Sequence, residues 1–345
     1  MKFRRMLFCA MMLLISSHGT ARDLTVVSWG GKIQEVQNKI YFKPFSETSK
    51  ISIANPAWDG GIALLRERIK GQSDDWDVVQ IDAADLLRGC REGLFEQVNW
   101  AALGGRERYL KNAVSDCGVG SIVYSLVLAY DPAKQKKSPV SWKDFWDQKK
   151  FPGKRGMKIG PKANLEIALM ADGVAPEDVY PLLSTPRGIE RAFRKLDEIK
   201  QDLVWWEKGS DPARMLSANE VAMTTAYNTR ISMANASEMK SFKIEWTNNL
   251  YAIDSWAILK GSSHKAEAEQ FLAYVSRPDI QKNLPSYMPY GLTHKDAGNL
   301  LDKASVMADL PSNSAYLKTA LYVDEEFWAA NENKLAQRFK TWLLK

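Results

Sequence analysis

An arginine and an aspartate, Arg230 and Asp254, are the residues whose types and spacing point most directly to binding chemistry. They lie in segment 227–256, YNTRISMANASEMKSFKIEWTNNLYAIDSW, and aromatic residues lie close to each of them. Two opposite charges that are held apart could bind the two ends of a small zwitterion. The alternatives are that both are ordinary surface charges or that they join one internal salt bridge. The elements around them decide between these interpretations.

The N-terminal segment 1–21 has the composition of an export signal. Three basic residues stand among the first five, an apolar run follows at 6–15, and small and polar residues lead to Ala21. This order is typical of a secretory signal peptide. The apolar run is too short for a membrane-spanning helix, which needs ~20 residues. We expect cleavage near Ala21 and an exported mature protein.

The charge, the histidines and the cysteines of the mature chain limit the kinds of partner and site that it can have. Without segment 1–21 the formal charge falls from +6 to +3, since that segment holds three basic residues and no acidic ones. No cluster of Lys and Arg indicates a nucleic-acid partner. The two remaining histidines lie far apart, so no Cys/His spacing predicts a metal site. In an oxidising compartment, Cys90 and Cys117 are expected to form a structural disulfide, with two buried free thiols as the alternative.

The pattern of apolar residues predicts two α/β lobes. Short runs typical of strands alternate with helical segments through the first third of the chain, and the alternation repeats in the middle third. Two longer runs, 118–130 and 249–259, could cross between the lobes. Asp82 follows the apolar run 76–81, and ligands of open α/β sheets bind beyond the carboxyl ends of strands. The alternative role for Asp82 is the N-cap of a helix at 84–92.

Eight segments spread along the mature chain carry a family resemblance. They are VSWGG (27–31), DVVQIDAADLLRGCREGLFE (77–96), SWKDFW (141–146), VWWEKG (204–209), NEVAMTTAYNTR (219–230), AIDSWAI (252–258), FLAYVSRPDIQ (271–281) and EEFWAANENKLAQRFKTWL (325–343). In order and spacing, the chain resembles the extracellular solute-binding proteins of ABC importers, specifically the spermidine/putrescine-binding family. No single segment is a catalytic signature, so the resemblance rests on all of them together.

The resemblance implies a type II periplasmic binding fold. In this α/β fold two lobes are joined by two crossing strands and close over a ligand in the cleft between them. It places lobe 1 at 22–128 and 256–303, and lobe 2 at 129–255 and 304–345. It also implies a periplasmic protein without a cofactor, expected to be a monomer, that delivers a small ligand to an ABC permease in the inner membrane.

The resemblance further implies several ligand-binding residues. Members of the family hold ligand amines with acidic side chains and sandwich the carbon chain between aromatic rings. Asp254 falls on the family's amine-binding aspartate. Tyr227 and Tyr290 fall on aromatic positions of the cleft, and Trp29 belongs to the loop after the first strand that reaches the ligand.

Departures from the family pattern change the expected ligand. Loop 160–164, GPKAN, lacks the acids that hold a second amine, and Ala252 replaces an aromatic residue. Arg230 stands where polyamine binders have a small residue, and a guanidinium repels a diamine while pairing with a carboxylate. Asp82 could add an acid at the amine end. We therefore expect an ω-amino acid such as γ-aminobutyrate, with a polyamine as the alternative if Arg230 pairs internally with Asp82 or Glu207.

Three more candidate residues have two interpretations each. Strand alternation turns one of the adjacent Trp205 and Trp206 toward the sheet and leaves the other free to face the cleft; Trp206 is the candidate. Tyr124 either lines the cleft or packs within its strand. Ser210 is either a hydrogen-bond donor to a carboxylate or an ordinary turn residue.

Other classes of protein find less support in the sequence. An enzyme on the same fold would need a catalytic set, and the sequence holds no recognisable Ser/His/Asp, Cys/His or phosphate-loop pattern. A ferric-ion binder would need a Tyr-Tyr doublet, which the sequence lacks. A ligand receptor that feeds a sensor would use the same residues and differ only in its partner.

Overall fold

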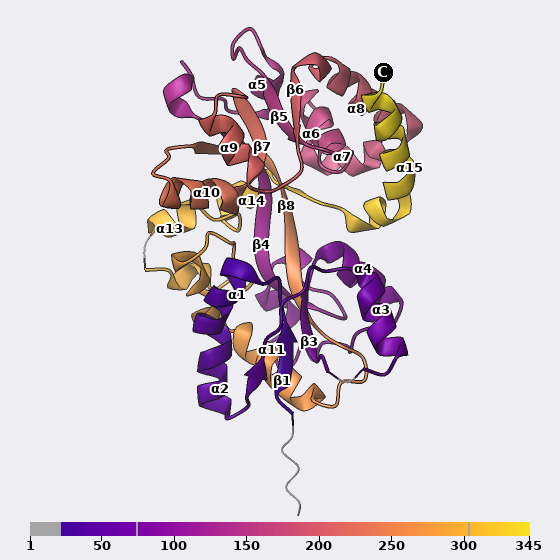
Figure 1. The fold of residues 1–345 in the computed structure, drawn as a ribbon, viewed down its shortest axis with the longest axis vertical. Helices are drawn as coiled ribbons and strands as arrows, with labels where there is room; N and C mark the ends of the chain where they lie inside the picture. Colours follow the sequence, from indigo (N-terminus) through magenta and orange to yellow (C-terminus); the bar gives the residue numbers. More distant parts are fainter. Residues whose placement is uncertain (1–21, 74, 303) are drawn as a thin grey trace, which may run out of the picture.

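The structure, a computed structural model, describes residues 22–345 apart from residues 74 and 303. The expected signal peptide lies outside the described residues. Two lobes lie one above the other in Figure 1, and two long antiparallel strands run through both. These strands are β4 (Val119–Tyr130) and β8 (Lys243–Ile258). The predicted α/β fold with two crossing strands is therefore confirmed.

Strand β8 is longer than the apolar run that predicted it. It begins at Lys243, whereas the run begins at residue 249. The added residues mix polar and apolar side chains, and they pair with the end of β4, where Glu245 lies opposite Leu128. In a strand with one solvated face, polar and apolar side chains alternate, so this part of β8 has no continuous apolar run to mark it.

Lobe 1 is built on parallel strands covered by helices. The strands are β1 (Leu24–Val27), β2 (Ile53–Ala54) and β3 (Val78–Ile81), and β3 pairs antiparallel with β8. Every residue of β1 and β3 is buried, as expected for strands covered on both faces. The helices of this lobe are α1 (Gly31–Gln37), α2 (Lys43–Ser49), α3 (Ile62–Lys70), α4 (Ala83–Arg91), α11 (Lys265–Val275) and α12 (Pro278–Gln281).

Lobe 2 continues the same sheet in the order β2-β1-β3-β8-β4-β7-β5-β6. Strand β5 (Arg155–Lys158) pairs in parallel with β6 (Leu203–Trp206) and β7 (Met223–Tyr227), and the short β9 (Leu321–Tyr322) pairs with β8. The helices up to β8 are α5 (Trp142–Trp146), α6 (Asn164–Ala171), α7 (Pro176–Leu183), α8 (Pro186–Asp197), α9 (Asp211–Ser217) and α10 (Asn228–Ser237). The chain ends through α13 (Ala304–Ala308), α14 (Ser314–Leu317) and α15 (Glu325–Leu343), and α15 lies against lobe 2 in Figure 1.

Each lobe has apolar cores of its own, and the crossing strands pass between them. On β4, Val123 belongs to a core of lobe 1 and Leu126 to the core of lobe 2. On β8 the same division falls between Leu250 and Ile253. Side chains between these positions lie at the level of the cleft. The lobe boundaries at 128/129 and 255/256 stay a prediction; by the division of the cores, Asp254, which follows Ile253, lies with lobe 1. Within the described part of the chain, no helix is both long and apolar enough to cross a membrane.

The predicted disulfide is present. Cys90 near the end of α4 is bonded to Cys117, two residues before β4, across a sequence separation of 27. The bond ties the helix that follows β3 to the start of a crossing strand. The prediction of a Cys90–Cys117 bridge is confirmed.

Removing this disulfide is expected to destabilise the protein without changing ligand affinity. For a loop of this length, the loss of a cross-link in the unfolded chain costs about 3 kcal/mol of unfolding free energy. Urea denaturation of a Cys90→Ser/Cys117→Ser variant, compared with the oxidised and the reduced wild type, measures the effect. Equal stability of the oxidised wild type and the double variant would contradict it.

Candidate ligand-binding cleft

Two adjoining chambers open between the lobes, where β4 and β8 pass from one lobe to the other. The first, the arginine chamber, has a volume of about 500 Å³; the second, the lysine chamber, has about 510 Å³. Asp82, Tyr124 and Tyr227 line both, so the chambers form one continuous cleft. Further walls of the arginine chamber are Trp29, Arg230, Asp254 and Tyr290, and those of the lysine chamber are Lys158, Lys162, Tyr251 and Glu325.

The ends of parallel strands position most of these side chains. Trp29 follows β1 and Asp82 follows β3 in lobe 1, while Lys158 and Tyr227 are the last residues of β5 and β7 in lobe 2. All four line the cleft. The carboxyl ends of the strands in the two lobes therefore face each other across it, which is where ligands of open α/β sheets bind.

Asp254 is a buried carboxylate on the lobe 1 side of β8. It pairs with Ile122 of β4, and only 7% of it is exposed. The indole Nε1 of Trp29 donates a hydrogen bond of 2.8 Å to its Oδ2. A carboxylate fixed by one donor in this way keeps its other oxygen for a ligand.

The environment of Asp254 favours the protonated carboxyl group. Burial and the nearby charge of Asp82 raise its pKa to about 8, and the hydrogen bond from Trp29 opposes the rise. In the ligand-free protein the group is therefore mostly neutral at pH 7. A ligand ammonium would supply the missing counter-charge and favour ionisation.

Trp29 is held in place by a stack of aromatic rings. Its ring lies parallel to that of Trp58, with centroids 5.7 Å apart and an angle of 10° between the planes. Trp58 in turn is buried and donates from Nε1 to the carbonyl of Gln80 at 3.1 Å. On the other side, Gly60 has φ of +84°, and an added Cβ would meet the Trp29 ring at 3.1 Å. The indole is thus fixed where it meets Asp254.

Replacing Trp29 by phenylalanine is expected to weaken binding of an amine-bearing ligand about tenfold. The change keeps a ring but removes the N–H that stabilises ionised Asp254, and a hydrogen bond to a charged group contributes roughly 1.5–3 kcal/mol. Because that bond opposes the raised pKa of Asp254, the pH at which affinity levels off should also move upward. Titrations over a pH series measure both effects.

Trp58→Phe is the matched control for this experiment. It removes an indole N–H from the same stack, but the lost bond goes to a backbone carbonyl. Lower stability with an unchanged pH profile is the expected result for this variant. If both variants shift the pH profile equally, the hydrogen bond to Asp254 is not the cause.

Arg230 lies in the first turn of α10 on the lobe 2 side of the cleft. Its side chain is exposed, and it makes no hydrogen bond or ion pair with any described residue, Asp82 and Glu207 included. The helix start is fixed by the buried side chain of Asn228, which accepts from the Ser125 amide at 3.0 Å and donates to the Pro289 carbonyl at 2.9 Å. The Arg230 guanidinium therefore has no partner among the described residues, and the backbone that carries it is held in place.

Three tyrosines form the aromatic walls. Tyr124 and Tyr227 meet edge to face, with centroids 6.0 Å apart. Tyr290 lies near both charges of the arginine chamber: burial and Asp254 raise the pKa of its phenol, while Arg230 lowers it. Groups of opposite charge and the faces of aromatic rings thus border the same space, which suits a small ligand with a charged group at each end of a short carbon chain.

Asp82 caps α4 and also lines the cleft. Its Oδ1 accepts a hydrogen bond of 2.8 Å from the Asp85 amide, as an N-cap of α4 does. The same side chain lines both chambers and forms no ion pair with a described residue. A capping carboxylate with no cationic partner remains available to a ligand amine.

Two candidates from the sequence lie outside the chambers. Trp206 is buried behind Tyr227 at a centroid distance of 5.9 Å and donates from Nε1 to Thr225 Oγ1 at 3.2 Å. Its neighbour Trp205 packs against α15. Both tryptophans therefore pack in or against the core of lobe 2 and do not line the cleft. Ser210 is exposed at the N-cap of α9, makes no capping bond and lines neither chamber.

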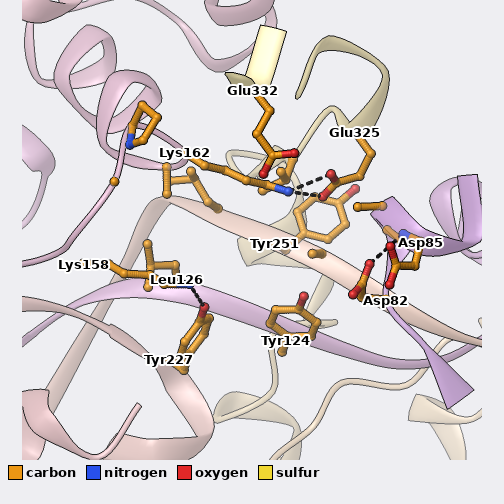
Figure 2. A pocket seen from close by; sticks show the side chains of 18 of the residues that line it. Asp82, Asp85, Tyr124, Leu126, Lys158, Lys162, Tyr227, Tyr251, Glu325 and Glu332 are labelled. Atoms are coloured by element: carbon orange, nitrogen blue, oxygen red, sulfur yellow. Dashed lines mark hydrogen bonds and ion pairs between the residues drawn. The ribbon is translucent and has the colours of Figure 1, made fainter. Parts of the chain in front are cut away.

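The charged walls of the lysine chamber were not anticipated. Lys158 donates a hydrogen bond of 2.9 Å to the Tyr227 hydroxyl, and Lys162 forms an ion pair of 2.7 Å with Glu325 (Figure 2). Lys158 stands at the end of a predicted strand, and this position could have indicated that it lines the cleft. No such pattern marks Glu325, because α15 comes from the far end of the chain.

The ionisable groups of the cleft that have no partner are segregated by lobe. On lobe 1, Asp82 and Asp254 have no cationic partner among the described residues; on lobe 2, Arg230 and Lys158 have no acidic partner among them. Such an arrangement can attract amines toward lobe 1 and carboxylates toward lobe 2. No group of three or more metal-ligating residues occurs in the described part of the chain.

Comparisons with known proteins identify the family of the chain. The pattern of the family described as bacterial extracellular solute-binding protein matches residues 41–316. The chain is 40% identical over 340 residues to the gamma-aminobutyric acid-binding protein of Pseudomonas aeruginosa, covering 99% of this chain and 96% of that protein. An ABC transporter substrate-binding protein from Bradyrhizobium japonicum USDA 110 has a similar solved structure, with a TM-score of 0.84 and 32% identity over 94% of this chain and 100% of that one. The solved Atu4243-GABA receptor has a TM-score of 0.81 and 26% identity over 93% and 98% of the two chains. The chain therefore belongs to the family of bacterial extracellular solute-binding proteins.

Proposed function

We propose that this protein is the periplasmic substrate-binding component of an ABC importer and that it captures an ω-amino acid such as γ-aminobutyrate. The observation that carries the proposal is the pairing, in one chamber, of buried Asp254 from lobe 1 with unpartnered Arg230 from lobe 2. The ligand ammonium binds Asp254, and the ligand carboxylate binds Arg230. Trp29, Tyr124, Tyr227 and Tyr290 enclose the methylene chain, and Asp82 adds negative potential at the amine end.

The relatives support this choice of ligand class. The Pseudomonas aeruginosa relative at 40% identity is a gamma-aminobutyric acid-binding protein, and a GABA receptor stands among the similar solved structures. A diamine would place one of its ammonium groups near Arg230, where the like charge opposes binding. A γ-amino acid has a carboxylate there instead.

Lobe closure is the proposed mechanism of capture. A ligand held by Asp254 and Arg230 contacts both lobes at once, so it stabilises the conformation in which the lobes are close. The crossing strands β4 and β8 connect the lobes and carry the hinge. The closed form then docks, as a monomer, on a permease in the inner membrane and releases the ligand without chemical change.

A polyamine such as putrescine is the second candidate ligand. Two acids without a cationic partner, Asp82 and Asp254, line the same chamber, and two acids suit two amines. This candidate requires that Arg230 turn away from the ligand, since a guanidinium beside an ammonium costs binding energy.

Isothermal titration of refolded, ligand-free protein with γ-aminobutyrate and with putrescine distinguishes the two candidates. The proposal predicts binding of the amino acid and much weaker binding of the diamine. Binding of putrescine alone would favour the second candidate, and no binding of either would overturn the ligand class.

A further inference from the structure

The lysine chamber contains an ammonium group without an acidic partner. Lys158, the last residue of β5, is half-buried, and the only hydrogen bond that its side chain makes to a described residue runs from Nζ to the Tyr227 hydroxyl at 2.9 Å. The nearby Lys162 differs, because Glu325 pairs with it at 2.7 Å and 2.8 Å (Figure 2). The Lys158 side chain therefore has spare N–H donors and no acidic partner among the described residues.

Tyr227 adds a second donor beside this ammonium. Its hydroxyl oxygen accepts from Lys158, so its own proton remains available for donation, and no described residue accepts it. Tyr227 lines both chambers, which places the donor pair at their junction. An ammonium and a phenol that both offer protons are suited to an anionic oxygen.

The acids of the lysine chamber do not balance Lys158. Glu325 forms an ion pair with Lys162, and Glu332 forms an ion pair of 2.8 Å with Arg88. Asp82 lies across the chamber from Lys158 in Figure 2, at the start of α4. The lobe 2 wall near Lys158 therefore carries unbalanced positive charge.

The cleft also has room for a ligand larger than a simple ω-amino acid. Each chamber alone, at about 500 Å³ and about 510 Å³, falls within the roughly 300–1,000 Å³ of typical small-molecule sites. A ligand held between Asp254 and Arg230 occupies the arginine chamber and leaves the lysine chamber to a substituent.

We propose that Lys158 and Tyr227 form a second anion subsite, so that the cleft also accepts amino dicarboxylic acids. The ammonium binds Asp254, one carboxylate binds Arg230, and the second carboxylate accepts hydrogen bonds from Lys158 and Tyr227. This inference rests on the proposed function, because it assumes the same placement of the amine and the first carboxylate.

The test is calorimetric titration with two ligands, γ-aminobutyrate and 2-(2-aminoethyl)butanedioate, which is γ-aminobutyrate with a carboxymethyl branch. We expect the wild type to bind both. Lys158→Met should weaken binding of the dicarboxylate about 30-fold, the loss expected for one contact between charged groups, and that of γ-aminobutyrate less than about threefold. Lys158→Arg, which keeps the charge, should bind both ligands nearly as well as the wild type.

Two further variants make the result unambiguous. Tyr227→Phe keeps the ring that encloses the methylene chain and removes the hydroxyl, so it should weaken binding of the dicarboxylate more than binding of γ-aminobutyrate. Lys149→Met removes an exposed lysine outside both chambers and should change neither affinity. Retained binding of γ-aminobutyrate reports that each variant is folded.

The outcomes separate this inference from the proposed function. If the wild type binds γ-aminobutyrate but not the dicarboxylate, or if Lys158→Met changes both affinities equally, the second subsite is wrong and the proposed function stands. If the wild type does not bind γ-aminobutyrate, the proposed function fails, and the inference fails with it.

Discussion

Asp254→Asn is expected to weaken γ-aminobutyrate binding at least about 100-fold at pH 8. The change keeps the size of the side chain and removes the only charge that meets the ligand ammonium in a buried setting, where loss of one partner of a hydrogen-bonded pair costs roughly 2–5 kcal/mol. Trp29 then donates to a neutral amide oxygen, so the ammonium loses its counter-ion. Titration calorimetry of wild type and variant measures the loss.

The pH dependence of binding gives the same prediction a second readout. Because the pKa of Asp254 is raised to about 8 in the free protein, the wild type should gain affinity about tenfold per pH unit as pH rises toward 8 and then level off. At pH 7, binding should release up to one proton per ligand, which titrations in buffers of different ionisation enthalpy detect. The asparagine variant should show neither effect.

The stability of the free protein should follow the opposite trend. A carboxyl group whose pKa in the folded protein lies far above the ordinary value of an aspartic acid stabilises the fold at low pH, and this contribution is lost progressively as pH rises to about 8. Free wild type should therefore lose stability relative to Asp254→Asn as pH rises from about 4 to about 8. Equal pH profiles for the two proteins would mean that Asp254 does not titrate in this range.

Arg230→Ala is the second change with a large expected effect. It should weaken γ-aminobutyrate binding about 100-fold, because a guanidinium contributes charge-assisted hydrogen bonds of roughly 1.5–3 kcal/mol to a carboxylate. It should also raise putrescine affinity about tenfold, since a like charge beside the second ammonium is removed. The variant would then prefer a diamine.

Two controls accompany this prediction. Arg230→Lys keeps the charge but loses the two-pronged geometry, so an intermediate affinity is expected. Arg194→Ala removes an exposed arginine of α8 that lines neither chamber and should leave both affinities unchanged. Unchanged γ-aminobutyrate binding in Arg230→Ala would place the ligand carboxylate elsewhere.

The sequence predicted the fold well because local patterns carry it. Continuous apolar runs marked β3 and β4, since parallel and central strands are buried on both faces. The cysteine pair in an exported chain predicted the disulfide. The start of β8 was missed because residues 243–248 are partly solvated and lack that pattern.

The sequence indicated residues that line the cleft where a strand end or the family resemblance marks a single position. Asp82 after β3 follows from the position of strand ends, and Asp254 and Trp29 follow from the family resemblance. Whether Arg230 is free depends on its distance from acids remote in sequence, which no local pattern encodes. Trp206 was misjudged for a similar reason: alternation along β6 says nothing of α15, which covers the outer face and packs against Trp205.

The crystal structure of the protein with γ-aminobutyrate tests the central claim most directly. The claim predicts the ligand in the arginine chamber, with its ammonium within hydrogen-bond distance, about 3 Å, of Asp254 and its carboxylate at the same distance from Arg230. The two lobes should be closer together than in a ligand-free crystal. A ligand bound in the reverse orientation, or with Arg230 turned to Glu207 and solvent at the carboxylate, would contradict the account.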